Sequence, residues 1–183
     1  MKHFLYLLLL SFFLIISPGK HFAQETQVLS IPVEPGQKVE VTGNLNAGKV
    51  IPLRWANSSQ VACFPATRNQ EFEGNHVFYR AELPKYSTLV ITLIPTGKHR
   101  INLYGIRQST QADYQEIPPN IHSAVCDSDY PLYAGKTDLS KGGENQDLEF
   151  MAINNPYSIL IGVAGAVGVK EGDFKLQVEI RGR

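Results

Sequence analysis

The sequence predicts an all-β protein with about eight to eleven short strands, and three observations support this fold class. Residues 173–180 alternate between apolar and polar side chains without exception, which is typical of a strand with one buried face. Other short segments rich in β-branched and aromatic residues recur between turns that contain Pro or Gly. No window of eleven or more residues after residue 23 has convincing helical periodicity. Strands at this spacing form either a sandwich or a barrel.

In the first part of the chain, the expected elements are short and are separated by turn signals. Residues 27–33 and 38–42 are expected to be extended and to be joined by the turn Glu34-Pro35-Gly36. Residues 49–55 can form a strand, which Pro52 restricts to a sheet edge or an irregular piece. The remaining segments are two expected loops, at residues 43–48 and 66–74, and a short extended piece at residues 60–64.

The clearest strands come next, at residues 77–83, 88–94 and 100–106. Each alternates in the manner of a strand and is rich in β-branched and aromatic residues. Only the short turns Pro84-Lys85-Tyr86 and Pro95-Thr96-Gly97 separate them. We therefore expect these three strands to pair in sequence as a meander.

The last third of the chain contains long connections and a final pair of strands. The connections are polar and rich in Pro or Gly, at residues 108–120 and 128–145. Short strands are expected at residues 122–127, which include Cys126, and at residues 148–153. Two further apolar segments flank a glycine-rich turn, at residues 158–164 and 173–180. We expect these two segments to form a hairpin against which the other strands pack.

Residues 1–23 are expected to be a secretory signal peptide that precedes a single domain at residues 24–183. A basic start is followed by an apolar run at residues 4–16. This run of about 13 residues is shorter than the roughly 20 that span a bilayer. We therefore expect export to the periplasm or out of the cell, with cleavage after Ala23. A retained membrane anchor is the alternative.

The charge of the exported chain argues against two classes of partner. Removal of residues 1–23 takes away Lys2 and Lys20 and leaves fifteen basic and seventeen acidic residues, a net charge of about −2. Nucleic acid and anionic lipid both require a basic surface. No later apolar stretch is long enough to span a membrane. We expect neither a nucleic-acid partner nor a transmembrane segment in the mature chain.

The two cysteines, Cys63 and Cys126, are expected to form a disulfide. An even number of cysteines in an exported protein predicts a disulfide, and two allow one connectivity. Because the closed loop is long, the bond is expected to stabilise the fold by roughly 3–4 kcal/mol. A metal site or a catalytic thiol is the alternative, although neither cysteine has another Cys or a His within four residues except His122, before Cys126. A free-thiol assay that finds two reactive groups in native protein would contradict the disulfide.

Two blocks of the chain share an order of motifs with a known family. In the first, the aromatic residues 77–83 are followed by the alternating residues 89–93 and by Ile101-Asn102-Leu103-Tyr104. In the second, Asn155-Pro156-Tyr157 precedes residues 160–163 and the final strand Gly172-Asp173-Phe174-Lys175-Leu176-Gln177-Val178. Over about 60 residues, this order resembles the bacterial pre-peptidase C-terminal domain.

This resemblance implies an antiparallel, jelly-roll-like β-sandwich that is secreted and acts as a non-catalytic accessory module. It implies no catalytic residue. The chain departs from the family at three points. Asn102 stands where the family often has Asp, residues 106–147 are longer than usual, and the cysteine pair is not a general feature of the family.

Calcium is the one cofactor that the sequence suggests. Asp127, Asp129 and Asp138 lie in a Gly- and Ser-rich loop, and carboxylates in an Asp-x-Asp pattern can bind a hard cation. The spacing of an EF-hand is absent, so a solvated acidic loop is the alternative. The three histidines after residue 23 are about 23 residues apart, and this spacing does not support a local zinc site.

Four aromatic residues outside regular core positions are the candidates for ligand binding: Trp55, Tyr114, Tyr130 and Tyr133. A sandwich that binds glycans often displays such rings at its loops, where a flat ring meets the apolar face of a sugar. The alternative is that the rings pack at the rim of the core and cap turns.

The function expected from these features is that of a binding or accessory module at the bacterial cell envelope. Its ligand would be an unknown glycan or protein. The sequence has no Gly-x-Ser-x-Gly nucleophile motif, and we assign no catalytic residue. Two alternatives stay open: a small secreted hydrolase with its site in the long loops, and a structural component of the envelope.

Overall fold

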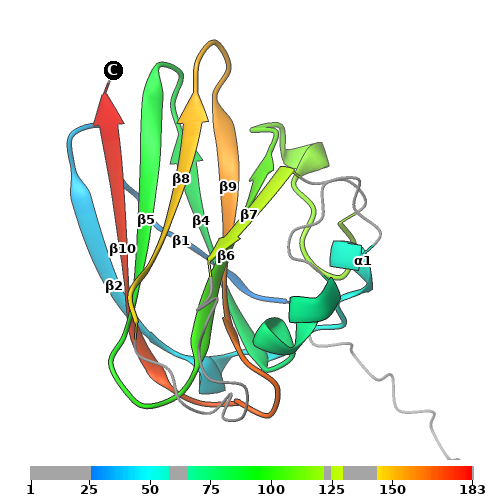
Figure 1. Cartoon of the computed structure of the whole chain (residues 1–183). Helices are drawn as coiled ribbons and strands as arrows, with labels where there is room; N and C mark the ends of the chain where they lie inside the picture. The colour runs from blue at the N-terminus through cyan, green and yellow to red at the C-terminus, as the bar shows by residue number, and fades with distance from the viewer. Residues whose placement is uncertain (1–25, 58–65, 122–124, 130–143, 183) are drawn as a thin grey trace, which may run out of the picture.

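The computed structural model describes residues 26–57, 66–121, 125–129 and 144–182, and it shows two β-sheets packed face to face as a sandwich (Figure 1). The first sheet contains six strands: β1 (Val28–Ser30), β3 (Lys49–Val50), β4 (Asn75–Leu83), β6 (Ile101–Gln108), β7 (Val125–Asp129) and β9 (Tyr157–Gly165). The second contains four: β2 (Lys38–Asn44), β5 (Ser87–Pro95), β8 (Gln146–Ala152) and β10 (Asp173–Gly182). The predicted all-β sandwich is confirmed.

The order of strands in each sheet differs from the order in the chain. The first sheet runs β1-β4-β9-β6-β7, with β3 also paired to β4, and the second runs β2-β10-β5-β8. All neighbours are antiparallel except β1 and β4, which are parallel. The sandwich is therefore built from strands that meet neighbours distant in sequence.

Two predicted pairings are wrong. The strands β4, β5 and β6 do not form a meander, because β5 belongs to the second sheet and its sequence neighbours to the first. The segments β9 and β10 do not form a hairpin, because they also lie in different sheets. Each intervening turn crosses between the two layers, which are about 10 Å apart in a sandwich. Alternation shows that a strand has a buried face, but it does not show which strand lies beside it.

The main core lies between the sheets and explains the different patterns of β9 and β10. Apolar side chains from both inner faces form this core, including Leu89, Ile161 and Leu176. Strand β10 alternates because its second face is open to solvent. Strand β9 is buried on both faces from Ser158 to Gly165, so its sequence is mainly apolar and does not alternate with polar residues.

A second core covers the outer face of the first sheet. Short helical segments cover this face: α1 (Arg54–Asn57), the 3-10 helix η2 (Ala66–Phe72) and the connection that ends at Ile121. The expected strand at residues 49–55 therefore shortens to Lys49–Val50, and the expected exposed loop at residues 66–74 is largely helical. Its end is buried, because Phe72 packs in the second core.

The other short helices are η1 (Leu45–Ala47) and η3 (Ala112–Tyr114). Within the described residues, no helix has the length and apolar character needed to cross a membrane.

Candidate functional site

Three connections meet at one end of the sandwich, the end that also carries the C-terminus (Figure 1). They are the β4–β5 turn at residues 84–86, the β8–β9 turn at residues 153–156, and the segment at residues 109–111 between β6 and η3. The registers Leu83 opposite Tyr157 and Gln108 opposite Ser158 bring the strand ends together. Loops at the end of a rigid sandwich are common positions for binding residues.

A groove of about 520 Å³ lies between two of these connections, and residues 107–111 and 155–157 line it. Most of its lining residues carry a hydroxyl, amide or guanidinium group, and Pro156 and Tyr157 add apolar surface. Such a mixture offers several directional hydrogen bonds beside a ring, which suits a polar ligand of appreciable size.

Arg107 is the charged residue of the groove, and its guanidinium lies 4.8 Å from the centroid of the Tyr157 ring. This cation–π contact restrains the side chain. Across the described part of the chain, Arg107 forms no ion pair. The groove therefore carries a positioned positive charge without a carboxylate partner among those residues.

Side-chain hydrogen bonds fix the segment that forms one wall of the groove. Gln108 Nε2 donates to the carbonyl oxygen of Glu116, and Arg80 donates to Gln115 Oε1. Gln115 Nε2 in turn donates to the carbonyl oxygen of Thr110, at 3.3 Å. These contacts hold residues 109–116 against the first sheet, so the wall is formed before any ligand arrives.

The structure separates the four aromatic candidates. Tyr114 is 66% exposed at the end of η3, three residues after Gln111 of the groove. Trp55 is only 3% exposed and packs in the second core, with its ring 5.8 Å from that of Tyr104. Its ring therefore does not form part of an exposed groove with Tyr114. Tyr130 and Tyr133 lie outside the described residues.

The predicted calcium site and disulfide also fall largely outside the described residues. Asp127 is exposed, and its Oδ1 accepts from the Ser128 amide at 2.9 Å. The side chain of Asp129 and all of Asp138 lie outside the described part, and within that part no three acidic, His or Cys residues cluster as metal ligands. Cys63 lies outside it as well, and the backbone of Cys126 lies opposite Ile106 in β7. Both sites stay predictions.

His76 is buried and serves the fold through two hydrogen bonds. Its Nε2 lies 2.7 Å from the carbonyl oxygen of Phe72, and its Nδ1 lies 2.9 Å from the hydroxyl of Tyr104. Because a carbonyl only accepts, Nε2 carries the proton and Nδ1 accepts from Tyr104. Burial lowers the pKa of His76 to about 4 and raises the pKa of Tyr104. The imidazole is therefore neutral at pH 7.

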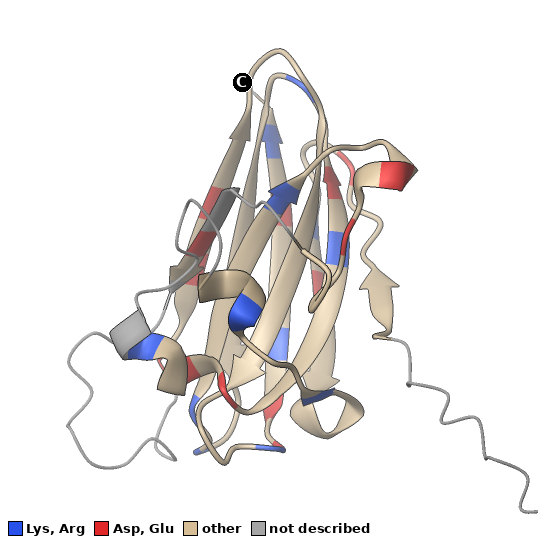
Figure 2. Ribbon diagram, turned by 90° about the vertical axis from the view of Figure 1, so that its right-hand side faces the viewer, with Lys and Arg blue, Asp and Glu red and all other residues tan. Residues whose placement is uncertain are grey.

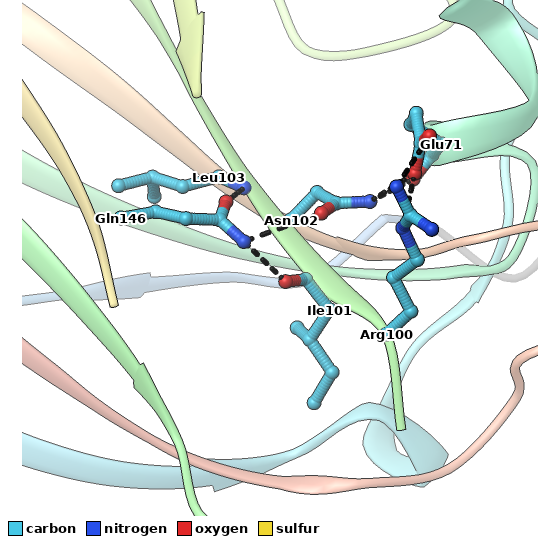
Figure 3. Close-up of polar contacts among 6 residues, drawn as sticks. All are labelled: Glu71, Arg100, Ile101, Asn102, Leu103 and Gln146. Atoms are coloured by element: carbon cyan, nitrogen blue, oxygen red, sulfur yellow. Dashed lines mark hydrogen bonds and ion pairs between the residues drawn. The ribbon is translucent and has the colours of Figure 1, made fainter. Parts of the chain in front are cut away.

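A second buried polar cluster joins η2, β6 and β8 (Figure 3). Arg100 Nε and Nη2 lie 2.7 and 2.9 Å from the two carboxylate oxygens of Glu71. Asn102 Nδ2 donates to the carbonyl oxygen of Glu71 at 2.6 Å and lies 3.3 Å from its Oε2. This bidentate pair and its amide partner attach η2 to the start of β6.

Gln146 completes the cluster from the opposite sheet. Its Oε1 accepts from the Leu103 amide at 2.8 Å, and its Nε2 donates to the Ile101 carbonyl oxygen at 2.7 Å. These backbone groups belong to the part of β6 where the pairing with β7 begins at Leu103. The side chain of Gln146 thus provides hydrogen-bond partners for backbone groups at the end of the β6–β7 pairing, and buried polar groups need such partners.

Sequence analysis missed this cluster because Glu71 lies in a segment expected to be an exposed loop. In the sequence, Asn102 stands out only as a departure from the resembling family, and nothing in its neighbourhood in the sequence points to Glu71. In the structure, an Asp at position 102 would place a second carboxylate against Glu71 and would lose the amide donor.

No family model matches the chain, and no curated protein matches it. Among solved structures, it is similar to the pre-peptidase C-terminal domain of a collagenase from Bacillus anthracis, with 9% identity and a TM-score of 0.41 over 86% of this chain and 97% of that one. It is also similar to PliG, a periplasmic inhibitor of g-type lysozyme from Aeromonas hydrophila, with 10% identity and a TM-score of 0.39 over 84% of this chain and 97% of that one. The first is a member of the family that the strand motifs resemble; at these values neither likeness carries a conclusion about ligand or activity.

Proposed function

We propose that the mature chain is an exported, non-catalytic β-sandwich that binds a glycan at the bacterial cell envelope. The observation that carries this proposal is the groove formed by residues 107–111 and 155–157, with the exposed Tyr114 only three residues after Gln111 in the chain. The apolar run at residues 4–16 supports export.

The chemistry of the groove favours a sugar ligand. A sugar presents hydroxyl groups in several directions and also an apolar face, so it needs hydrogen-bonding side chains together with a flat ring. The groove supplies amide and hydroxyl groups from Gln111, Thr110 and Asn155, and Tyr157 lines it. The exposed Tyr114 follows Gln111 by three residues in the chain. Arg107 would pair with a carboxylate on an acidic sugar.

The same positive charge would also suit an acidic protein ligand, which is the alternative partner. Figure 2 shows that Lys and Arg positions and Asp and Glu positions are interspersed along the strands and connections. This distribution, with the net charge of about −2 after loss of residues 1–23, disfavours a nucleic-acid partner.

The remaining alternatives have less support. A hydrolase would need a base near a nucleophile or carboxylate. His76 contacts Tyr104 and a backbone carbonyl, among the described residues His99 forms no hydrogen bond or ion pair, and His122 lies outside the described residues. A self-assembling envelope component would need open strand edges. The outer strands of the second sheet, β2 and β8, carry exposed charges such as Glu40 and Glu149, which discourage edge pairing.

The test is binding of the purified chain from Gln24 onward to an array of bacterial and host glycans. We expect at least one glycan to bind and the Gln111→Ala and Tyr114→Ala variants to weaken that binding roughly tenfold each. The matched control is Gln70→Ala, an exposed glutamine in η2 outside the groove. Absence of binding to any glycan, or equal loss in the control, would overturn the proposal.

A further inference from the structure

Tyr86 has a backbone conformation that side chains other than glycine rarely adopt. Its φ is 58°, and among the described residues every other positive φ belongs to a glycine. In this left-handed region the side chain of an L-residue crowds its own backbone, whereas glycine is unstrained. The β4–β5 turn therefore contains a tyrosine at a position where glycine would be more stable.

Packing of the ring does not explain this tyrosine. Tyr86 is 56% exposed, and its amide donates to the Ile153 carbonyl oxygen at 3.1 Å, a bond that any residue except proline can form. The described contact of the ring is with Lys85, whose Nζ lies 5.7 Å from the ring centroid. Strain held at an exposed side chain points to a role in binding rather than in folding.

Two further apolar residues are exposed next to Tyr86. Ile153 is 56% exposed and Met151 is 39% exposed. The register of Ser87 opposite Ala152 places Ile153 beside Tyr86, and Met151 lies two residues before Ile153 along the chain. We call Tyr86, Met151 and Ile153 the apolar ledge.

The apolar ledge adjoins the groove across the β8–β9 turn. Ile153 belongs to the apolar ledge, and Asn155 and Pro156, which follow it by two and three residues, line the groove. Two extended residues span at most about 7 Å. Figure 1 shows the β4–β5 and β8–β9 turns next to each other at this end of the sandwich.

We infer that the ligand is an oligosaccharide chain that fills the groove and continues over the β8–β9 turn, where one of its sugar rings stacks on Tyr86. This inference rests on the proposed glycan-binding function and extends it from a single subsite to a chain. Arg107 and the amide groups hold one part of the chain in the groove, and the exposed Tyr86 ring receives the apolar face of a later sugar.

Two variants separate the effect of the backbone strain at Tyr86 from the effect of its aromatic ring. Tyr86→Gly removes both, and Tyr86→Ala removes the ring but keeps a side chain at positive φ. We expect Tyr86→Gly to melt about 3 °C above the wild type and Tyr86→Ala to gain no stability. Equal melting temperatures of the two variants would overturn the argument from strain.

The binding test uses a length series, from monosaccharide to hexasaccharide, of the glycan that binds best on the array. Wild-type affinity is expected to rise with length, and both variants should bind the hexasaccharide about tenfold more weakly while binding the shortest active member normally. Gln70→Ala is again the matched control.

The outcomes distinguish the two proposals. If the wild type binds no glycan, both fall. If it binds, but the Tyr86 variants bind long chains as the wild type does, the chain-binding inference is overturned and the proposed function stands. If the variants instead lose an acidic protein ligand, the inference of a saccharide on the apolar ledge is overturned.

Discussion

The hydroxyl of Tyr104 donates to Nδ1 of His76 across 2.9 Å, between two strands that are not neighbours in the sheet. Strand β9 runs between them, and Gly162 lies opposite both Phe78 and Tyr104 in the register. The rings of Trp55 and Phe72 pack on Tyr104 from the second core. This relationship links the first sheet to the helical layer that covers it.

Stability should depend on pH through His76. Its pKa is about 4 in the folded chain, against an ordinary value of 6.5 that we expect when it is unfolded. The unfolded state therefore binds a proton first, so stability is full above pH 6.5 and is lost as the pH falls toward 4. We expect His76 to contribute a loss of about 2–3 kcal/mol between pH 7 and 4.5.

Urea unfolding of wild type and His76→Gln at pH 7, 5.5 and 4.5 measures this loss. Glutamine offers a donor and an acceptor but does not titrate, so the variant should lack this part of the pH dependence. His99→Gln, at a partly exposed histidine, is the control. Parallel pH profiles for wild type and His76→Gln would show that His76 is not responsible.

Gly162→Ala should destabilise the fold strongly. A Cβ at this position would overlap the ring atoms of Tyr104. The ring has little room to move, because Trp55, Phe72 and Phe78 surround it. We expect a loss of about 3 kcal/mol in the free energy of unfolding. Gly97→Ala, where a Cβ meets nothing within 4 Å, should stay close to the wild type.

Asn102→Asp should show how much stability depends on the amide donor of Asn102. The new carboxylate would face Glu71 and could no longer donate to it, so we expect a loss of about 3 kcal/mol at pH 7. The loss should shrink near pH 4, where a protonated Asp can donate. Chemical unfolding at both pH values measures it, with the exposed Asn154→Asp as control. An equal loss at both values would point to packing rather than to charge.

Glu71→Gln should cost far more stability than the same change at an exposed ion pair. Glu71 and Arg100 are both almost fully buried, and removal of one charge leaves the other uncompensated, with an expected loss of about 3–5 kcal/mol. Glu40, whose Oε1 lies 3.0 Å from Lys175 Nζ at the surface, is the matched control, and Glu40→Gln should leave the melting temperature nearly unchanged. Similar melting temperatures for the two variants would contradict a structural role of the buried pair.

Most strands were predictable because alternation directly records burial. Residues 173–180, 77–83 and 88–94 all lie in strands of the structure, with bounds shifted by a few residues. Tyr114 was also predictable as an exposed ring, because it lies in a polar connection. Trp55 was not, since the face that buries it belongs to strands β4, β6 and β9, which are far from it in sequence.

The groove and the buried cluster depend on contacts between distant segments. Glu71 and Asn102 are 31 residues apart, and the two walls of the groove come from residues 107–111 and 155–157. The local sequence does not identify these partners, because the sequence around a polar residue in a loop does not show whether its side chain faces solvent or another part of the protein.

By itself, the sequence determined that this protein is made of strands, which side chains alternate along them, and that its first 23 residues have the pattern of an export signal. Only the tertiary structure decided that β4, β5 and β6 alternate between two sheets, that Trp55 is buried, and that the turns carrying Tyr86 and Asn155 lie side by side. The physical reason is that the periodicity of apolar residues shows how many faces of a strand are buried, whereas the packing of the whole chain determines which element covers each face.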